Sequence, residues 1–441
     1  MKSQSVDTTC CIVGGGPAGV MLGYLLARAG VRVTILEKHK DFFRDFRGDT
    51  VHPSTLELLY ELGLLKKFLK QPHQELTSVG VTIGDFSFKV ADLQGLRTHC
   101  QFVAIMPQWD FLNFLSGEGK SFPGFDLRME HEAIDLVYDQ GRVQGVVVRT
   151  PSGNEEITAD LVIACDGRHS MMRDAGRLEV SELGVPIDVL WFHISRRPQD
   201  REEVLGHINY GKVLVLINRN DYFQAGLLIR KNTFEQVKQK GLEAFRHDIA
   251  QNAPFLSDRV DEIKSWDQVK LLTVQINRLE RWHRPGLLCI GDAAHAMSPV
   301  FGIGVNLAIQ DAVAAANILA QPLYGQRNTD PFLHKVQRRR ELRVRMTQLL
   351  QVIAHAGFKY VFRTQGPLHP NRLFRVVARA RLMQPILLHV VGIGSVPEHV
   401  RTPNLPERRS RGTVARIIGL TAAIAAAISV VSLSFNAKIR R

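Results

Sequence analysis

The sequence predicts an α/β protein in which a Rossmann-like domain, a parallel sheet with helices, is interleaved with a mixed or antiparallel-sheet domain and followed by C-terminal helices. Three observations predict this class. Residues 8–37 are typical of a strand, a glycine turn, a helix and a second strand. Two later segments, residues 161–170 and 287–306, each place a Gly and an Asp side by side after an apolar strand. Residues 185–275 consist mainly of alternating strands.

The first segment begins with a β-branched, apolar run over residues 8–13, which is typical of a buried parallel strand. The following Gly14, Gly16 and Gly19 fit the pattern G-x-G-x-x-G. In this pattern the first glycine permits a sharp turn, the second lets the backbone approach a pyrophosphate, and the third lets the helix pack closely on the sheet. The segment therefore predicts a dinucleotide site.

A helix is expected to follow this turn, with Pro17 and Ala18 in its first turn, where the missing N–H of proline costs nothing. It should run to about residue 29 and stop at Gly30. A second strand over residues 31–36 ends at Glu37, about 20 residues past the glycines, where the pattern places an acceptor for a ribose hydroxyl.

At 441 residues, with 45% hydrophobic and 22% charged residues, the chain is globular and long enough for two joined domains. The order of segments predicts a nucleotide-binding domain (residues 1–75, 104–180 and 281–370), a substrate domain (76–103 and 181–280), a helical region with a basic linker (371–412) and a hydrophobic tail (413–441). The five cysteines show no C-x-x-C and no metal spacing, and no secretory signal precedes the first strand. We therefore expect buried, reduced thiols in a cytoplasmic protein with no metal.

Residues 38–48 predict a basic loop, and Pro53 opens a helix. Arg44 and Arg47 are either solvated loop charges or partners of a phosphate or flavin. A further helix is expected to begin at Gln108.

The apolar strand that ends at residue 165 is followed by Asp166-Gly167-Arg168. This sequence predicts either a carboxylate at the ligand-binding edge of the sheet or an ordinary turn. The substrate domain is expected to hold one helix over residues 233–250 and a strand over residues 269–281. Its aromatic residues and Arg219 are interpreted mostly as core, among them Trp191, Phe192, Tyr210, Tyr222 and Phe223.

In the third segment, Asp292 follows a strand, Pro299 breaks the chain, and Gly304, Val305 and Asn306 lead into an alanine-rich helix. The N-terminus of this helix can stabilise developing negative charge on a ligand. His295 is either an acid–base group or a hydrogen-bonded structural histidine.

The net charge of +13 is unevenly distributed, because residues 342–397 contain no Asp or Glu. Basic residues interleaved with apolar ones favour an anionic membrane face over nucleic acid, since no nucleic-acid module is recognisable. Residues 417–435 are uncharged and, as a helix, would span roughly 28 Å. The tail, residues 413–441, is therefore either a membrane anchor or interfacial helix, or a helix that packs on the body or on a partner.

Taken together, the glycine segment, CDGRHSMMR and GDAAHAMSP with GIGVNLAIQDA resemble the FAD-dependent aromatic-ring hydroxylases, the single-component flavin monooxygenases of the para-hydroxybenzoate hydroxylase type, including ubiquinone-pathway hydroxylases. The resemblance covers about residues 8–400 and includes RGDTVHPSTLELLYELG and PQWDFLNFL. It implies that NAD(P)H reduces a bound FAD and that O2 then forms a flavin C4a-hydroperoxide, which hydroxylates an aromatic or quinol-like substrate. The protein positions the reactants and excludes water.

The resemblance also implies roles for individual residues of this chain. The pyrophosphate of FAD would lie on the glycine turn, and the adenosine ribose on Glu37. The remaining FAD contacts would come from Arg47, with Arg44 as a weaker candidate, and from Gln108, Asp166, Asp292, Pro299, Gly304, Val305 and Asn306. Asp166 would serve NAD(P)H as well. Phe301 departs from the glycine that many relatives carry beside the flavin, and a ring there would narrow the approach of oxygen or substrate.

Two other functions remain open from the sequence. An FAD-dependent reductase or dehydrogenase of an isoprenoid or other lipophilic substrate would share the fold but would saturate a double bond. A non-enzymatic flavin- or membrane-binding protein would hold FAD that nicotinamide cannot reduce. Oxygen uptake that is driven by NAD(P)H and increased by an aromatic compound distinguishes the monooxygenase from both.

Overall fold

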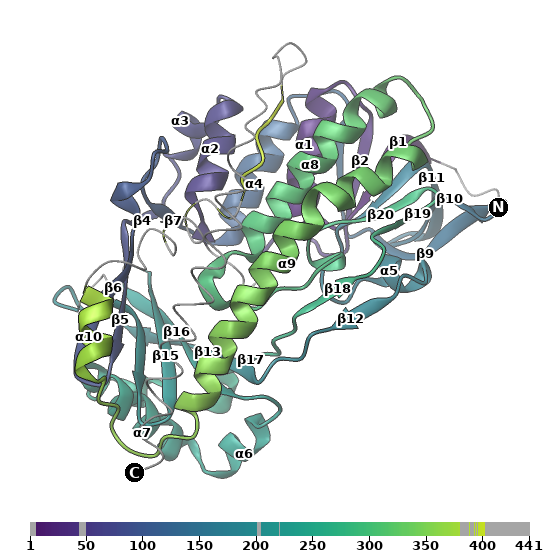
Figure 1. Cartoon of the computed structure of the whole chain (residues 1–441). Helices are drawn as coiled ribbons and strands as arrows, with labels where there is room; N and C mark the ends of the chain where they lie inside the picture. The colour runs from purple at the N-terminus through teal and green to yellow at the C-terminus, as the bar shows by residue number, and fades with distance from the viewer. Residues whose placement is uncertain are drawn as a thin grey trace.

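The structure is a computed structural model that describes residues 6–43, 50–200, 204–219, 221–379 and 396–401, together with residues 388, 392 and 394. Its two large sheets confirm the predicted fold class, and its helices gather mainly beside the first sheet (Figure 1). The helices are α1 (Pro17–Arg28), α2 (Pro53–Glu61), α3 (Leu65–Phe68), α4 (Gln108–Gly119), α5 (Met171–Ala175), α6 (Phe234–Gln239), α7 (Leu242–Asn252), α8 (Gly304–Tyr324), α9 (Asp330–Val361) and α10 (Arg372–Arg379).

The first sheet has a parallel centre in the order β20-β11-β1-β2-β8. These strands are β1 (Val6–Val13), β2 (Val33–Glu37), β8 (Phe125–Met129), β11 (Gly153–Ala164) and β20 (Leu287–Cys289). Antiparallel strands extend it: β9 (Glu132–Asp139), β10 (Arg142–Thr150) and β19 (His283–Arg284). Parallel pairing brings the carboxyl ends of β1, β11 and β20 to one edge, although these strands are far apart in the sequence.

The second sheet is mixed and has the order β17-β13-β16-β15-β14-β5-β6, in which only β14 and β5 are parallel. Its strands are β5 (Ser78–Ile83), β6 (Phe86–Asp92), β13 (Ile187–Ser195), β14 (Val204–Asn209), β15 (Lys212–Asn218), β16 (Tyr222–Arg230) and β17 (Lys270–Leu272). Two small sheets pair β3 (Thr50–Val51) and β4 (Gln74–Leu76) with β7 (Val103–Ile105), and β12 (Val180–Glu182) with β18 (Asn277–Leu279). The first sheet is formed by segments expected for the nucleotide-binding domain, and the second by segments expected for the substrate domain. The domain boundaries themselves stay a prediction.

Two local predictions were wrong. Residues 233–250 form two helices, α6 and α7, because Gly241 between them has φ of 88° and interrupts the helical path. Residues 269–281 form two short strands in different sheets, β17 beside β13 and β18 beside β12.

All five cysteines are buried, and burial raises the pKa of the Cys11 thiol to about 12.

Helix α9 connects the two large sheets, whereas α1 and α8 pack on the first one. The buried residues of α1 and α8 belong to the core of the first sheet. The long helix α9 runs from the region of β19 and β20 toward the second sheet (Figure 1). Among the described residues, one helix, Val300–Tyr324, which includes α8, is long and apolar enough to cross a membrane. However, 67% of its most apolar stretch of 18 residues is buried inside the protein. It is therefore a core helix.

Candidate active site

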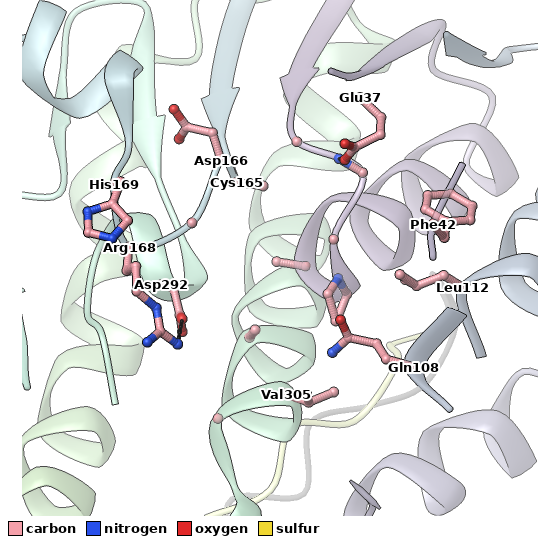
Figure 2. Close-up of a pocket in the computed structure, with 18 of the residues that line it drawn as sticks. Glu37, Phe42, Gln108, Leu112, Cys165, Asp166, Arg168, His169, Asp292 and Val305 are labelled. Atoms are coloured by element: carbon pink, nitrogen blue, oxygen red, sulfur yellow. Dashed lines mark hydrogen bonds and ion pairs between the residues drawn. The ribbon is translucent and has the colours of Figure 1, made fainter. Parts of the chain in front are cut away.

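A cavity of about 900 Å³ lies at the carboxyl ends of the parallel strands. The loops after β1, β11 and β20 line one part of it, and β13, β15, β16 and β17 of the second sheet line another. Figure 2 shows Arg168, His169 and Asp292 on one side of the view and Glu37, Phe42 and Gln108 on the other. The three sequence segments that carry the motifs thus meet at one space.

The glycine turn contacts the cavity through Gly14 and Gly16, whereas Gly19 packs behind it. Gly14 has φ of +106°, and a Cβ there would lie 2.4 Å from the carbonyl oxygen of Cys165. A Cβ on Gly19 would lie 2.0 Å from the carbonyl oxygen of Gly14. By contrast, a Cβ on Gly16 would have no atom within 4 Å. Two glycines therefore permit close packing, and the third leaves space beside the cavity.

Two of the helices that begin at the cavity, α1 and α8, have no side-chain cap and no acidic residue in their first turn. The N-cap of α1 is Gly16 and that of α8 is Ile303, and neither makes a side-chain cap hydrogen bond. Pro17 and Ala18 at the start of α1 line the cavity, as do Gly304 and Val305 of α8. Because the first N–H groups of a helix have no partner within it, both ends favour a negatively charged ligand group.

Glu37 ends β2 at the cavity, and the glycine turn and its own loop hold its carboxylate in place. Oε2 accepts from the backbone N–H of Gly15 at 3.1 Å, and Oε1 accepts from the N–H of His39 at 3.1 Å. Gln108, at the start of α4, lines the same part of the cavity. Arg44 and Arg47 lie outside the described residues.

Asp166 lines the cavity, but its carboxylate also organises the chain after β11. It accepts from Ser170 Oγ at 2.5 Å and from the N–H of Met172 at 3.1 Å. Burial raises its pKa, and these two hydrogen bonds oppose that effect. The neighbouring Arg168 instead reaches Asp292, with Nη2 3.5 Å from Oδ2. Arg168 is thus a site residue that the sequence reasoning left without a role, although it stands in the same motif.

Asn306 does not line the cavity, because its side chain joins α8 to the segment that precedes α2. Its Oδ1 accepts from the N–H of His52 at 3.0 Å and from Thr55 Oγ1 at 2.7 Å. The backbone of Asn306 remains part of the first turn of α8.

The turn before α8 is formed by Pro299, Phe301 and Gly302. Phe301 has φ of +72° and Gly302 φ of +65°, two successive left-handed residues. Pro299 and Gly302 line the cavity. Phe301 is not among the lining residues, so the expected narrowing by its ring is not observed. A phenylalanine in this conformation is strained, and the contacts around it must compensate.

Helix α9 supplies such contacts through buried polar side chains. The Gln351 amide donates to the carbonyl oxygens of Ser298 and Val300, at 2.9 and 3.1 Å, and accepts from the N–H of Ser298 at 3.1 Å. Ser298 Oγ lies 2.9 Å from His355 Nε2, and burial lowers the pKa of His355 to about 4. His355 is therefore neutral near pH 7, and α9 holds the segment that carries Pro299.

His295 is structural rather than an acid–base group at the cavity. It is 1% exposed, and its Nε2 lies 2.5 Å from Asp311 Oδ2. Asp311 also accepts from Arg340 Nε at 2.7 Å and from the N–H of Gly291 at 3.0 Å. This buried cluster joins α8 and α9 to the turn that presents Asp292.

The second sheet contributes Trp191, Ile217 and Gln224 to the cavity. Gln224 Oε1 accepts from Arg219, at 3.3 Å from Nε and 3.1 Å from Nη2. Because a guanidinium only donates, this contact leaves the NH₂ group of Gln224 for the cavity. The periodicity of the sequence could not identify Gln224 as a cavity residue. Trp191 also lines the cavity, although most aromatic residues of this sheet were expected in the core. Phe192 and Phe223 do pack in the core, on the side of α7.

Known proteins similar to this chain include several monooxygenases. The model of the FAD binding domain family matches residues 7–349. The 6-methylpretetramide 4-monooxygenase of Streptomyces rimosus is 30% identical over 390 residues, which are 88% of this chain and 93% of the relative. The rifampicin monooxygenase of Streptomyces venezuelae is 26% identical, covering 68% of this chain and 61% of the relative.

Solved structures show the same fold. PqsL of Pseudomonas aeruginosa, a probable FAD-dependent monooxygenase, has a TM-score of 0.68 at 18% identity, covering 85% of this chain and 100% of that chain. OxyS, the anhydrotetracycline hydroxylase from Streptomyces rimosus, has a TM-score of 0.65 at 21% identity, covering 88% of this chain and 76% of that chain.

Proposed function

From the premise that this chain belongs to the FAD binding domain family and is an FAD-dependent monooxygenase, we propose that it hydroxylates a flat, fused-ring phenol or quinol, with NAD(P)H as the reductant and O2 as the oxygen source. The observation that carries the proposal is the pair of uncapped helix N-termini, those of α1 and α8, at one cavity. They provide two places for negative charge, as a dinucleotide with a redox-active ring requires.

The residues around the cavity fit FAD. The space beside Gly16 would accept a pyrophosphate, which a side chain there would displace, and Glu37 at the end of β2 would accept from the adenosine ribose. Gln108 lines the cavity and would also contact the cofactor. Asp292, next to Arg168, would bind the ribityl chain, and Asp166 would serve both FAD and NAD(P)H through the loop that it organises.

At the other end of the cavity, Pro299 would line the reactive face of the flavin, and the first turn of α8 would meet its N1–C2 carbonyl edge. Gly304 and Val305 would bind there, and Asn306 would do so through its backbone, since its side chain is committed to His52 and Thr55. We retain Arg47, and more weakly Arg44, as proposed flavin contacts.

When bound, FAD supplies the redox chemistry, accepting a hydride from NAD(P)H and activating O2 for the insertion of one oxygen atom. The chain itself would position the reactants and keep water away from them. The N–H groups of α8 would stabilise negative charge near the ring, and the second sheet, which lines the cavity, would limit the access of water.

The wall of the second sheet suggests the substrate class. Trp191 and Ile217 offer flat apolar surface, and the NH₂ group of Gln224, oriented by Arg219, can donate to a phenol or quinol oxygen. The compounds for which the similar enzymes are named, 6-methylpretetramide and anhydrotetracycline, support a fused-ring compound.

To test the function, the full chain is purified, its visible spectrum is recorded, and NAD(P)H-driven O2 uptake is measured with a panel of naphthols and quinols. We expect a yellow chromophore, increased uptake, and one atom of labelled O2 in the product. The Gln224→Leu variant should load FAD normally and raise the KM for the phenol about tenfold, since one hydrogen bond is lost. Saturation of a double bond without oxygen insertion would support the reductase, and bound FAD that NAD(P)H does not reduce would support a non-catalytic protein.

We further propose a cytoplasmic location with attachment to the membrane through residues 413–441, which lie outside the described residues. The uncharged run over residues 417–435 and its basic flanks support this proposal. Deleting residues 413–441 should move the protein from the membrane to the soluble fraction in cell fractionation. Unchanged fractionation would contradict an anchoring role of the tail.

A further inference from the structure

Between Thr347 and His355, helix α9 buries polar side chains while apolar side chains are exposed on its outer face. Its buried side chains there include Thr347, Gln348, Gln351 and His355. Its exposed side chains include Leu342 at 63%, Leu349 at 57% and Val352 at 37% exposure. A surface helix of a soluble protein normally buries the apolar face and exposes the polar one. The outward face of α9 is therefore suited to an environment other than water.

The exposed residues form one continuous row. We define the α9 stripe as Arg338, Leu342, Arg345, Leu349, Val352 and Lys359, all of which are exposed. They follow one another at intervals of three, four or seven residues, which places them on one face of the helix. Every member is either apolar or positively charged.

From Leu342 to its end, every charged residue of α9 is basic. Glu341 accepts from Arg345 at 2.5 Å, and from Leu342 to Pro397 the sequence has no acidic residue. Helix α10 shows the same combination, with Leu373 53% and Val376 63% exposed between arginines. A second copy of this chain would place like charges against each other. A surface of anionic headgroups over hydrocarbon instead matches both components.

We propose that the α9 stripe docks on an anionic lipid surface, with α9 parallel to the membrane and its leucines at the boundary between headgroups and acyl chains. Burial of the leucines and attraction of the basic residues to anionic headgroups both favour reversible binding. The proposal depends neither on the substrate nor on residues 413–441, because it concerns the contact made by the folded body.

A fluorescent label at residue 349 tests this contact directly. All five native cysteines are buried, so the full-length Leu349→Cys variant offers a selective site for an environment-sensitive thiol dye. Leu183, which is 37% exposed and lies beyond β12, provides the control variant Leu183→Cys. With vesicles of phosphatidylcholine and phosphatidylglycerol, we expect a blue shift of the label at 349 and quenching by nitroxide lipids, but neither at 183. Pure phosphatidylcholine should give a weaker signal.

A second pair of variants measures the strength of binding. Leu349→Glu combined with Val352→Glu should weaken vesicle binding about tenfold or more, because charge replaces apolar contact, whereas Leu183→Glu should not. Normal FAD loading in these variants would show that the fold is intact. If the label at 349 stays aqueous on vesicle-bound protein, the tail alone holds the chain and the proposal is overturned. Burial of the label in a dimer, seen by size-exclusion chromatography, would overturn it in favour of a second copy.

Discussion

Replacing Gly16 with alanine is expected to weaken FAD binding strongly while leaving the fold intact. Gly16 has φ of −74°, which alanine adopts readily, and an added Cβ would meet no protein atom within 4 Å. That Cβ would occupy the space proposed for the pyrophosphate. We expect FAD affinity, measured by fluorescence titration of the apoprotein, to fall roughly a hundredfold, which corresponds to about 2.7 kcal/mol. The free energy of unfolding should change by less than about 1 kcal/mol.

Gly14→Ala is the matched comparison, because it changes the same loop by the same methyl group. At this position φ is +106° and the Cβ would lie 2.4 Å from the carbonyl oxygen of Cys165, so the protein should lose several kcal/mol of stability together with FAD. Urea unfolding of the two apoproteins separates these cases. Wild-type FAD affinity in the Gly16 variant would show that the pyrophosphate does not lie on this turn.

Replacing Asp311 with alanine is expected to destabilise the protein by about 3–5 kcal/mol, because it leaves the buried Arg340 without its main partner. Arg340 is 1% exposed, and its other carboxylate contact, with Glu398, is longer at 3.5 Å. Urea unfolding measures the loss. The control is Asp126→Ala, which removes a 2.8 Å pair with Arg128 at a half-exposed position and should cost about 0–1 kcal/mol. Equal losses in the two variants would contradict a special role for the buried cluster.

The Asp311 carboxylate also makes the free energy of unfolding depend on pH. Burial alone would raise the pKa of Asp311, but His295 and Arg340 hold it below its usual range. A carboxyl group with a lowered pKa in the folded state stabilises the protein above its ordinary pKa of about 3.9, and this contribution is lost as the pH falls through the folded-state pKa. The difference in unfolding free energy between the wild type and Asp311→Asn should therefore shrink below about pH 4. A difference that grows in acid would contradict this assignment.

The fold class, the glycine turn and the meeting of the three motifs could be predicted from the amino-acid sequence. The reason is that these features depend on local periodicity and on one rule, that parallel strands bring their carboxyl ends to the same edge. Strands β13 and β15 lie in residues 185–275, where alternating strands were expected, because apolar runs bounded by turns are a strong local signal. The split at Gly241 was missed because a helical pattern does not reveal whether a glycine will adopt a positive φ.

Only the tertiary structure decided how individual side chains are used. Asn306 is occupied by His52 and Thr55, and Gln224 is oriented by Arg219, through contacts that no spacing in the sequence predicts. The orientation of α9 is the clearest case. Periodicity shows that a helix has two faces, but which face is buried depends on the groups packed against it. In this protein the Ser298 segment requires hydrogen-bonding partners, so α9 turns its glutamines and His355 inward and leaves Leu342 and Leu349 outside.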